Sequence, residues 1–277
     1  MTTFALTDNL DWAVEKRPLF FAGNDGQPVQ WDEKAAVVRA DTGRALGVVS
    51  SAYETVQNAD LRKLVDPMVS EGVLNIENIG FLNHGAKVFI QARINQEFQV
   101  LGEDYKAYIT LLNGHTGNAS VAIGNSATRV ICGNTFAMAY SDLSERYRHM
   151  EGVNNRVLAS DAVVSYVNDS MRIYATKVET LASAPCSIDQ FQTALEAVYQ
   201  KDIAKMRNVE TFTELFVSGT GGGNEGRTFY DAFNGITDFG SNRSRKTVAG
   251  RFNYSNFGAG ASINRRAMSV LTEMAAV

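Results

Sequence analysis

The spacing of apolar residues changes part-way along this chain, and the change limits the folds that it can adopt. Residues 87–94, KVFIQARI, alternate strictly, with Val88 and Ile90 on the face opposite Lys87. That is the spacing of a strand with two different faces. From about Val157 the apolar residues recur every three or four positions, as in a helix that buries one face. Strands followed by helices predict an α+β fold.

Turn residues divide the first part of the chain into short strands. Asn24-Asp25-Gly26 and Asp41-Thr42-Gly43 each stand between apolar runs and predict two hairpins. A helix is expected over residues 57–72, with Asn58 as its N-cap and a kink at Pro67. Alternating stretches then predict an antiparallel sheet of about five strands. They are residues 76–82, 86–94, 104–112, 120–124 and 127–132.

Helices are expected in most of the remaining chain. One begins at Asn134, and another follows Ser187 and Gln190, which have the spacing of a capping box. The glycine-rich stretch SGTGGGNEGRT, residues 218–228, is expected to be a flexible surface loop. Further helices are expected at 209–217, at 229–240 and from Ser262 onward, with a basic loop before the last.

The two halves differ in character. Residues 1–150 are expected to be mainly antiparallel β structure with two helices. Residues 151–277 are expected to be helical, with the glycine-rich loop and a basic C-terminal segment. Because no linker composition separates them, we expect the halves to pack as one unit.

Charge is distributed unevenly along the chain. The whole sequence has 26 Lys and Arg against 30 Asp and Glu, a net charge of −4. From Arg227 to the end there are seven Lys or Arg and three Asp or Glu, so this part carries +4 and the remainder −8. Such asymmetry favours a polyanionic partner for the C-terminal part.

The segment 241–267 contains six cations, three aromatic residues and no acid. It can be interpreted as a solvated loop that keeps the protein soluble. The interpretation we favour is a groove for nucleic acid, because arginine donors match phosphate and aromatic rings stack on bases. The candidate contacts are Arg243, Arg245, Lys246, Arg251, Phe252, Tyr254, Phe257, Arg265 and Arg266.

Two cations on expected strands are also candidates. Arg129 lies among apolar and small residues, so it is either paired within the fold or presented to a ligand from the sheet. Lys106 lies on the polar face of its strand. Both could extend a phosphate-binding track across the sheet.

No catalytic, metal or cofactor site is expected. The glycine-rich stretch lacks the Gly-Lys-Ser/Thr ending of a phosphate-binding loop. His84, His115 and His149 are scattered, and Cys132 and Cys186 have no ligand spacing. Two separate thiols, no signal peptide and no apolar stretch of membrane length together favour a cytoplasmic protein.

Several stretches together resemble a family of phage- and plasmid-encoded proteins described only as a domain of unknown function. They are VVRADTGRALGVVSSAYETVQN, NGHTGNASVAIGNSATRVICGNTF, FYDAFNGITDFGSNRSRK and GAGASINRRAMSVL, which span roughly residues 35–275. The resemblance implies an origin in a bacteriophage or another mobile element.

The order of helix, antiparallel strands and helix, beginning at YETVQNADLRKLVDPMVSEG, more weakly resembles the core of phage single-strand annealing proteins. That resemblance implies single-stranded DNA as the partner and a homo-oligomeric ring or filament. We therefore expect a protein of phage or plasmid DNA recombination or replication that binds single-stranded DNA, with annealing of complementary strands as a further expected activity and no covalent chemistry. Two alternatives stay open: a protein-binding module, such as an inhibitor of host defence, and an enzyme that processes nucleotides or nucleic acid.

Overall fold

The computed structural model describes residues 4–7, 10–117, 121–130, 133–139, 146–147 and 160–276. The chain divides into two compact units, and each is built from three separate stretches. Unit 1 comprises Met1–Asn95, Ile109–Gly124 and Tyr140–Val164. Unit 2 comprises Gln96–Tyr108, Asn125–Ala139 and Ser165–Val277.

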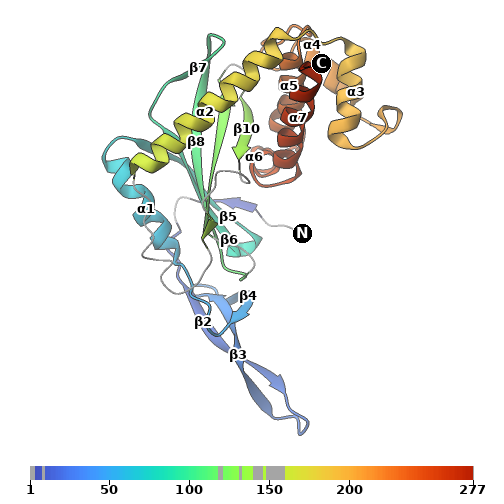
Figure 1. Ribbon diagram of the computed structural model, residues 1–277. Coiled ribbons are helices and arrows are strands. Elements are labelled where there is room, and N and C mark those ends of the chain that lie inside the picture. Colours follow the sequence, from blue (N-terminus) through green and yellow to red (C-terminus); the bar gives the residue numbers. More distant parts are fainter. Residues whose placement is uncertain are drawn as a thin grey trace. The chain divides into compact units, whose positions relative to one another are not determined.

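The strands form two sheets (Figure 1). The small sheet contains β2 (Val14–Ala22), β3 (Pro28–Arg39) and β4 (Arg44–Ser50) in that order. The larger sheet has the order β1-β5-β6-β8-β9-β10, and β7 and β11 pair with β8 and β9. Its strands are β1 (Phe4–Leu6), β5 (Leu74–Leu82), β6 (Lys87–Ile94), β7 (Phe98–Val100), β8 (Glu103–Gly114), β9 (Val121–Arg129), β10 (Asn134–Ala139) and β11 (Arg146–Tyr147).

Most of the helices belong to the C-terminal half. The helices are α1 (Asn58–Ser70), α2 (Ser160–Ser183), α3 (Ile188–Tyr199), α4 (Val209–Val217), α5 (Phe229–Asp238), α6 (Val248–Asn256) and α7 (Ala259–Ala275). The described residues also form the shorter helical turns η1 (Asn83–Gly85), η3 (Ile203–Lys205) and η4 (Phe239–Arg243). The expected α+β class, with an antiparallel sheet and a helical C-terminal half, is confirmed.

In unit 1 the base of the small sheet has its own core. Val14, Val37, Val49 and Tyr53 are buried together, and Trp12 packs against them. Both predicted hairpins form at this sheet, because β2 pairs with β3 and β3 pairs with β4, each antiparallel.

The distal part of the β2–β3 hairpin forms an arm, which we define as residues 18–33. Figure 1 shows β2 and β3 as a long ribbon. Because β4 pairs only with Lys34–Arg39, the arm is two-stranded. None of its residues is buried, and its large apolar side chains Phe20, Phe21, Val29 and Trp31 are exposed.

The first turn of α1 differs from the expected cap. Gln57, not Asn58, is the N-cap residue, and its backbone N–H donates to the Asp60 carboxylate at 3.0 Å. Asn58 is buried instead, where its amide donates to the Trp12 carbonyl at 2.8 Å. Asn58 Oδ1 also lies 3.0 Å from His115 Nε2, so the two polar side chains are hydrogen-bonded to each other in the interior of unit 1.

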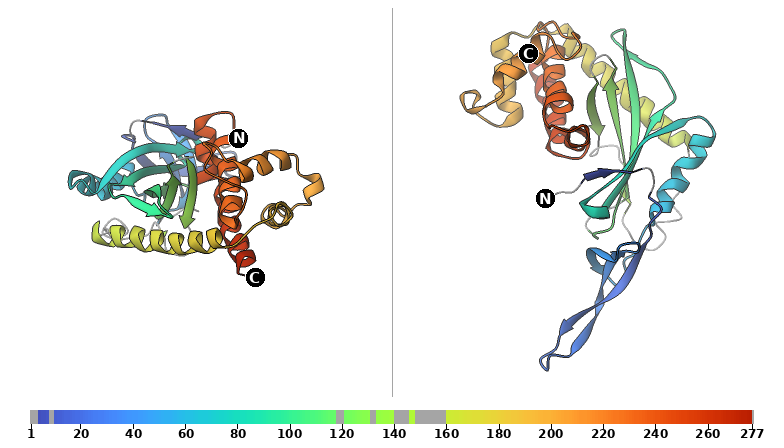
Figure 2. Two further views of the ribbon diagram at one scale, coloured as in Figure 1. Left: turned by 90° about the horizontal axis from the view of Figure 1, so that it is seen from above. Right: turned by 180° about the vertical axis from the view of Figure 1, so that it is seen from behind.

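In unit 2 the helix α5 lies at the centre of the helical part. All ten of its residues are buried, and it contacts α4, α7 and η4. Figure 2 shows α3 to α7, orange to red, grouped together. Phe216 of α4 stacks on Phe191 of α3 at 4.6 Å between ring centroids, and Phe212 packs on Phe239 at 4.4 Å. Burial of these rings is the main stabilising contribution in this part.

One expected helix is wrong. Residues 134–139 form strand β10, antiparallel to β9, whereas a helix was expected from Asn134. The backbone turns back at Gly133, which has φ 65°, so the chain pairs with the strand it has just left. Cys132 and His149 lie outside the described residues. Among the helices that are described, none has the length and apolar character needed to cross a bilayer.

Candidate nucleic-acid interface

Most of the segment 241–267 is helical, although a loop was expected before the helix from Ser262, and residues 244–247 link two helical elements without being helical. It begins in η4, a short π-helix that continues α5, and then forms α6 and most of α7. Thr247 caps α6, because its Oγ accepts the Gly250 N–H at 3.0 Å. Mid-sequence π-helical turns are often found at functional sites because they reorient side chains.

Four of the candidate cations gather between η4 and the middle of α6. Arg243, Arg245 and Lys246 are exposed, and Arg251 is half-buried. Arg251 Nη1 donates to the carbonyls of Arg245 and Lys246 at 3.1 and 3.3 Å. These two bonds hold the Arg251 guanidinium against the backbone of Arg245 and Lys246. We call these four residues the basic cluster.

The three candidate aromatics are partly packed within the fold. Tyr254 carries the Arg245 guanidinium over its ring, 4.6 Å from the centroid, and burial raises its pKa. A Cβ at Gly260 would lie 2.5 Å from the Tyr254 ring, so α6 and α7 meet there closely. Phe252 and Phe257 pack edge to face at 6.0 Å, and both stay half-exposed.

The two arginines of α7 have contacts of their own. Arg266 donates to the Val198 carbonyl in the last turn of α3, so it joins two helices. Arg265 donates to Ser262 at 3.3 Å. Both residues lie on α7, outside the stretch 243–251, so we leave them out of the basic cluster.

Arg129 and Lys106 have opposite environments. Lys106 is exposed on β8. Arg129 is buried and forms a two-pronged ion pair with Glu103, which answers the question left open by the sequence: it is paired within the fold. It is therefore corrected from a candidate ligand contact to a structural residue.

A cavity of about 220 Å³ lies beside the basic cluster. Arg251 and Phe252 line it, together with Asn242 of the π-helical turn and Ser255 of α6. Gly133, Ser241, Val248 and Asn256 complete the lining. The structure thus brings two of the sequence-predicted residues to one polar cavity.

Two polar side chains, Asn242 and Ser255, form part of the wall of this cavity. Asn242 Nδ2 donates to the buried Asp238 carboxylate at 2.8 Å, which fixes the orientation of the amide. The hydroxyl of Ser255 is buried and has no hydrogen-bond partner among the described residues. A buried hydroxyl without a partner costs about 1–3 kcal/mol.

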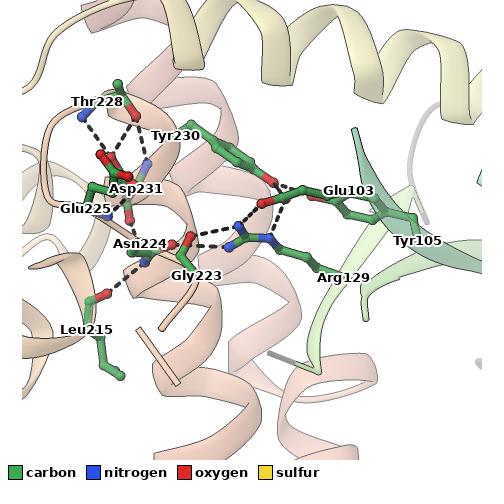
Figure 3. Close-up of polar contacts among 10 residues, drawn as sticks. All are labelled: Glu103, Tyr105, Arg129, Leu215, Gly223, Asn224, Glu225, Thr228, Tyr230 and Asp231. Atoms are coloured by element: carbon green, nitrogen blue, oxygen red, sulfur yellow. Dashed lines mark hydrogen bonds and ion pairs between the residues drawn. The ribbon is translucent and has the colours of Figure 1, made fainter. Parts of the chain in front are cut away.

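The glycine-rich loop is held by hydrogen bonds, contrary to the expected flexibility (Figure 3). The Asp231 carboxylate accepts from the backbone N–H groups of Glu225, Arg227 and Thr228 at 3.2, 3.0 and 3.0 Å. Asn224 bridges the loop to Arg129 at 3.1 Å and to the Leu215 carbonyl at 2.7 Å. The loop is therefore fixed to the first turn of α5 by these hydrogen bonds.

Comparison with protein families gives one match. The model described as "Domain of unknown function (DUF932)" matches residues 45–268. This chain belongs to the DUF932 family. The expected membership in a domain family of unknown function is thus confirmed. No curated protein and no solved structure is similar enough to count as a match.

The DUF932 match covers the basic cluster, the cavity and the buried Arg129 network, but it begins after the arm. Within it, sequence reasoning missed Asn242, Ser255 and Asn256 as cavity residues, because single polar side chains carry no spacing signal. It also missed Asp231, although Thr228 and Asp231 form a capping box that the sequence displays.

Proposed function

We propose that this protein binds single-stranded DNA through the basic cluster and takes part in annealing complementary strands during recombination or replication of a mobile element. The observation that carries the proposal is the basic cluster itself: Arg243, Arg245, Lys246 and Arg251 within nine residues of one folded surface, in a segment without an acidic residue. Glu214 approaches the cluster, 3.9 Å from Arg243, and both side chains are solvated.

The chemistry of the cluster suits a phosphate backbone. Guanidinium groups bind phosphate oxygens with paired donors, and Arg251 is already oriented by two carbonyls. Because the whole chain carries −4, a polyanion would be repelled from most of its surface and drawn to this local patch. Half-exposed Phe252 offers a ring on which a base can stack.

The proposal includes self-association of the free protein, with the arm of one copy against the basic cluster of another. The arm contains Asp25, Asp32 and Glu33 and no Lys or Arg, so it is complementary in charge to the acid-free segment 241–267. Its exposed aromatic side chains and unpaired edges are features of a protein contact. Such a head-to-tail contact generates rings or filaments. Because DNA would occupy the same cations, DNA binding and this contact are expected to compete.

The test is fluorescence anisotropy of a labelled single-stranded oligonucleotide, titrated at several salt concentrations, with duplex as a comparison. Arg243→Ala, Arg245→Ala and Arg251→Ala are combined in one variant. The matched control combines Arg172→Ala, Lys177→Ala and Lys201→Ala, which removes the same charge from exposed cations elsewhere.

The expected result is preferred binding of the single strand by the wild type. The slope of log K against log salt should become shallower by about 2 in the cluster variant, at roughly 0.7 for each lost phosphate contact. The control should keep its slope. Absence of binding at low salt, or equal losses in the two variants, would contradict the proposed function.

A further inference from the structure

The cavity beside the basic cluster has a size and lining that restrict what can enter it. Its volume of about 220 Å³ is below the range of roughly 300–1,000 Å³ that holds drug-sized ligands. It is lined by one cation, one aromatic ring, Val248, and amide and hydroxyl groups, with no acidic residue among them. A single small planar group with polar edges fits this lining better than a metal ion or a larger ligand.

We propose that this cavity receives one nucleobase of the bound strand, with the adjoining phosphate on Arg251. This inference rests on the proposed function and adds a subsite to it. Arg251 is the residue that joins the two regions, because it belongs to the basic cluster and also lines the cavity.

The polar wall matches the edge of a base. Asn242 and Asn256 both contribute amides, and each Nδ2 already donates within the fold, to Asp238 at 2.8 Å and to the Phe252 carbonyl at 3.0 Å. An amide nitrogen carries a second hydrogen, so a donor and an acceptor still lie in one plane, as they do on base edges. The Asn242 amide is held by Asp238, so its orientation is set before any ligand arrives. Preorganised polar groups of this kind discriminate between ligands at low entropic cost.

The Ser255 hydroxyl is the second, independent observation. It lines the cavity, it is 1% exposed as a residue, and it has no hydrogen-bond partner among the described residues. The oxygen itself is covered, so a base oxygen or nitrogen in the cavity would reach it only after a local shift of this wall. Phe252, on the same helix, supplies an aromatic surface for stacking.

The experiment compares two single-stranded oligonucleotides of equal length, one with normal bases and one with abasic sites throughout, by anisotropy at fixed salt. Both present the same phosphates, so the ratio of their affinities reports the contribution of the bases. The wild type should prefer the base-bearing strand by about tenfold, as for one stacked base.

Two variants locate that preference. Phe252→Leu removes the ring at the cavity and keeps an apolar side chain, and Ser255→Val removes the hydroxyl at similar volume. Either should reduce the ratio severalfold and leave the salt slope unchanged. Thermal melting establishes whether each variant is folded. If Ser255→Val, a change at a buried residue, does not fold, Phe252→Leu alone tests the base subsite.

The outcomes separate this inference from the proposed function. If the wild type binds the base-bearing and the abasic strand equally, the base subsite is excluded, although DNA binding itself is still supported. The same holds if the variants keep the wild-type ratio of the two affinities. Wild type that binds neither strand would overturn both. Deoxyadenosine monophosphate that binds more tightly than the strand, and loses affinity in Phe252→Leu, would make a free nucleotide the ligand and overturn the inference as stated.

Discussion

Glu103 and Arg129 form a two-pronged ion pair in unit 2, and Tyr230 donates to the same carboxylate at 2.9 Å. The Arg129 side chain is 3% exposed and that of Glu103 is 29% exposed. A guanidinium at this depth needs its counter-charge, because removing one partner of a buried pair leaves an uncompensated charge. The pair also connects the sheet to the glycine-rich loop, through the bond from Arg129 to Asn224 (Figure 3).

The first prediction concerns this pair. Glu103→Ala should lower the free energy of unfolding by roughly 3 kcal/mol, the lower end for a buried pair, because Glu103 is partly solvated. Urea denaturation followed by circular dichroism measures it. Glu225→Ala is the control, since its pair with Arg227 is exposed, and its cost should stay within about 0.5 kcal/mol. Equal costs would contradict the structural importance of Glu103.

The second prediction concerns the anchoring of the glycine-rich loop by Asp231. Asp231→Asn removes the charge that three backbone N–H groups share, and should cost about 2 kcal/mol. The amides of Glu225, Arg227 and Thr228 should then exchange hydrogen at least tenfold faster. Asp189→Asn on the exposed first turn of α3 should change neither quantity appreciably. Unaltered exchange in Asp231→Asn would show that the loop is held otherwise.

The third prediction concerns alkaline pH. Burial raises the pKa of Tyr230 to about 12 and also raises that of Tyr105. A tyrosine in the unfolded chain ionises near pH 10, so between about pH 10 and 12 the unfolded state binds fewer protons than the folded state. Stability should therefore fall as pH rises through this window, by about 1.4 kcal/mol per pH unit for each such tyrosine. In Tyr230→Phe the urea midpoint should fall less steeply with pH over this range than in the wild type. An equally steep fall would contradict the contribution of Tyr230.

The fourth prediction concerns the arm. Phe21→Ser with Trp31→Ser should shift sedimentation velocity toward the monomer and leave the melting temperature unchanged, because both side chains are about half-exposed. Ile173→Ser with Ile188→Ser alters two equally exposed apolar residues of α2 and α3 and serves as the control. A single-stranded oligonucleotide should have the same dissociating effect on the wild type. Assembly that survives the arm variant and the oligonucleotide would exclude the arm-to-cluster contact.

Sequence periodicity predicted the parts of the fold that depend on local signals. Asp41-Thr42-Gly43 turns the second hairpin as expected, and Gly43 has the positive φ that its place in the turn requires. Ser187 and Gln190 form the capping box that begins α3. In each case the residues that carry the signal also make the contact, so no information from distant parts of the chain was needed.

Long-range contacts explain what the sequence did not reveal. A helix was expected from Asn134 because Phe136, Tyr140, Leu143 and Tyr147 have helical spacing, but pairing with β9 makes residues 134–139 a strand. The glycine-rich loop has a flexible composition, but Asp231 accepts from its backbone, and Arg129 donates to its residue Asn224. For the candidate site, the basic cluster could be predicted from charge alone, whereas the cavity beside it depends on how η4 and α6 pack.

Because each of the two units is made of three separate stretches of chain, neither unit can be produced as one continuous fragment. A fragment from residue 165 onward would contain the basic cluster but would lack Arg129, which donates to Asn224 and Gly223 of the glycine-rich loop, and its partner Glu103. No single cut releases either unit intact. A recombination event that exchanged a continuous piece of the gene at these boundaries would thus separate strands from their own cores, so the two units are expected to be inherited together.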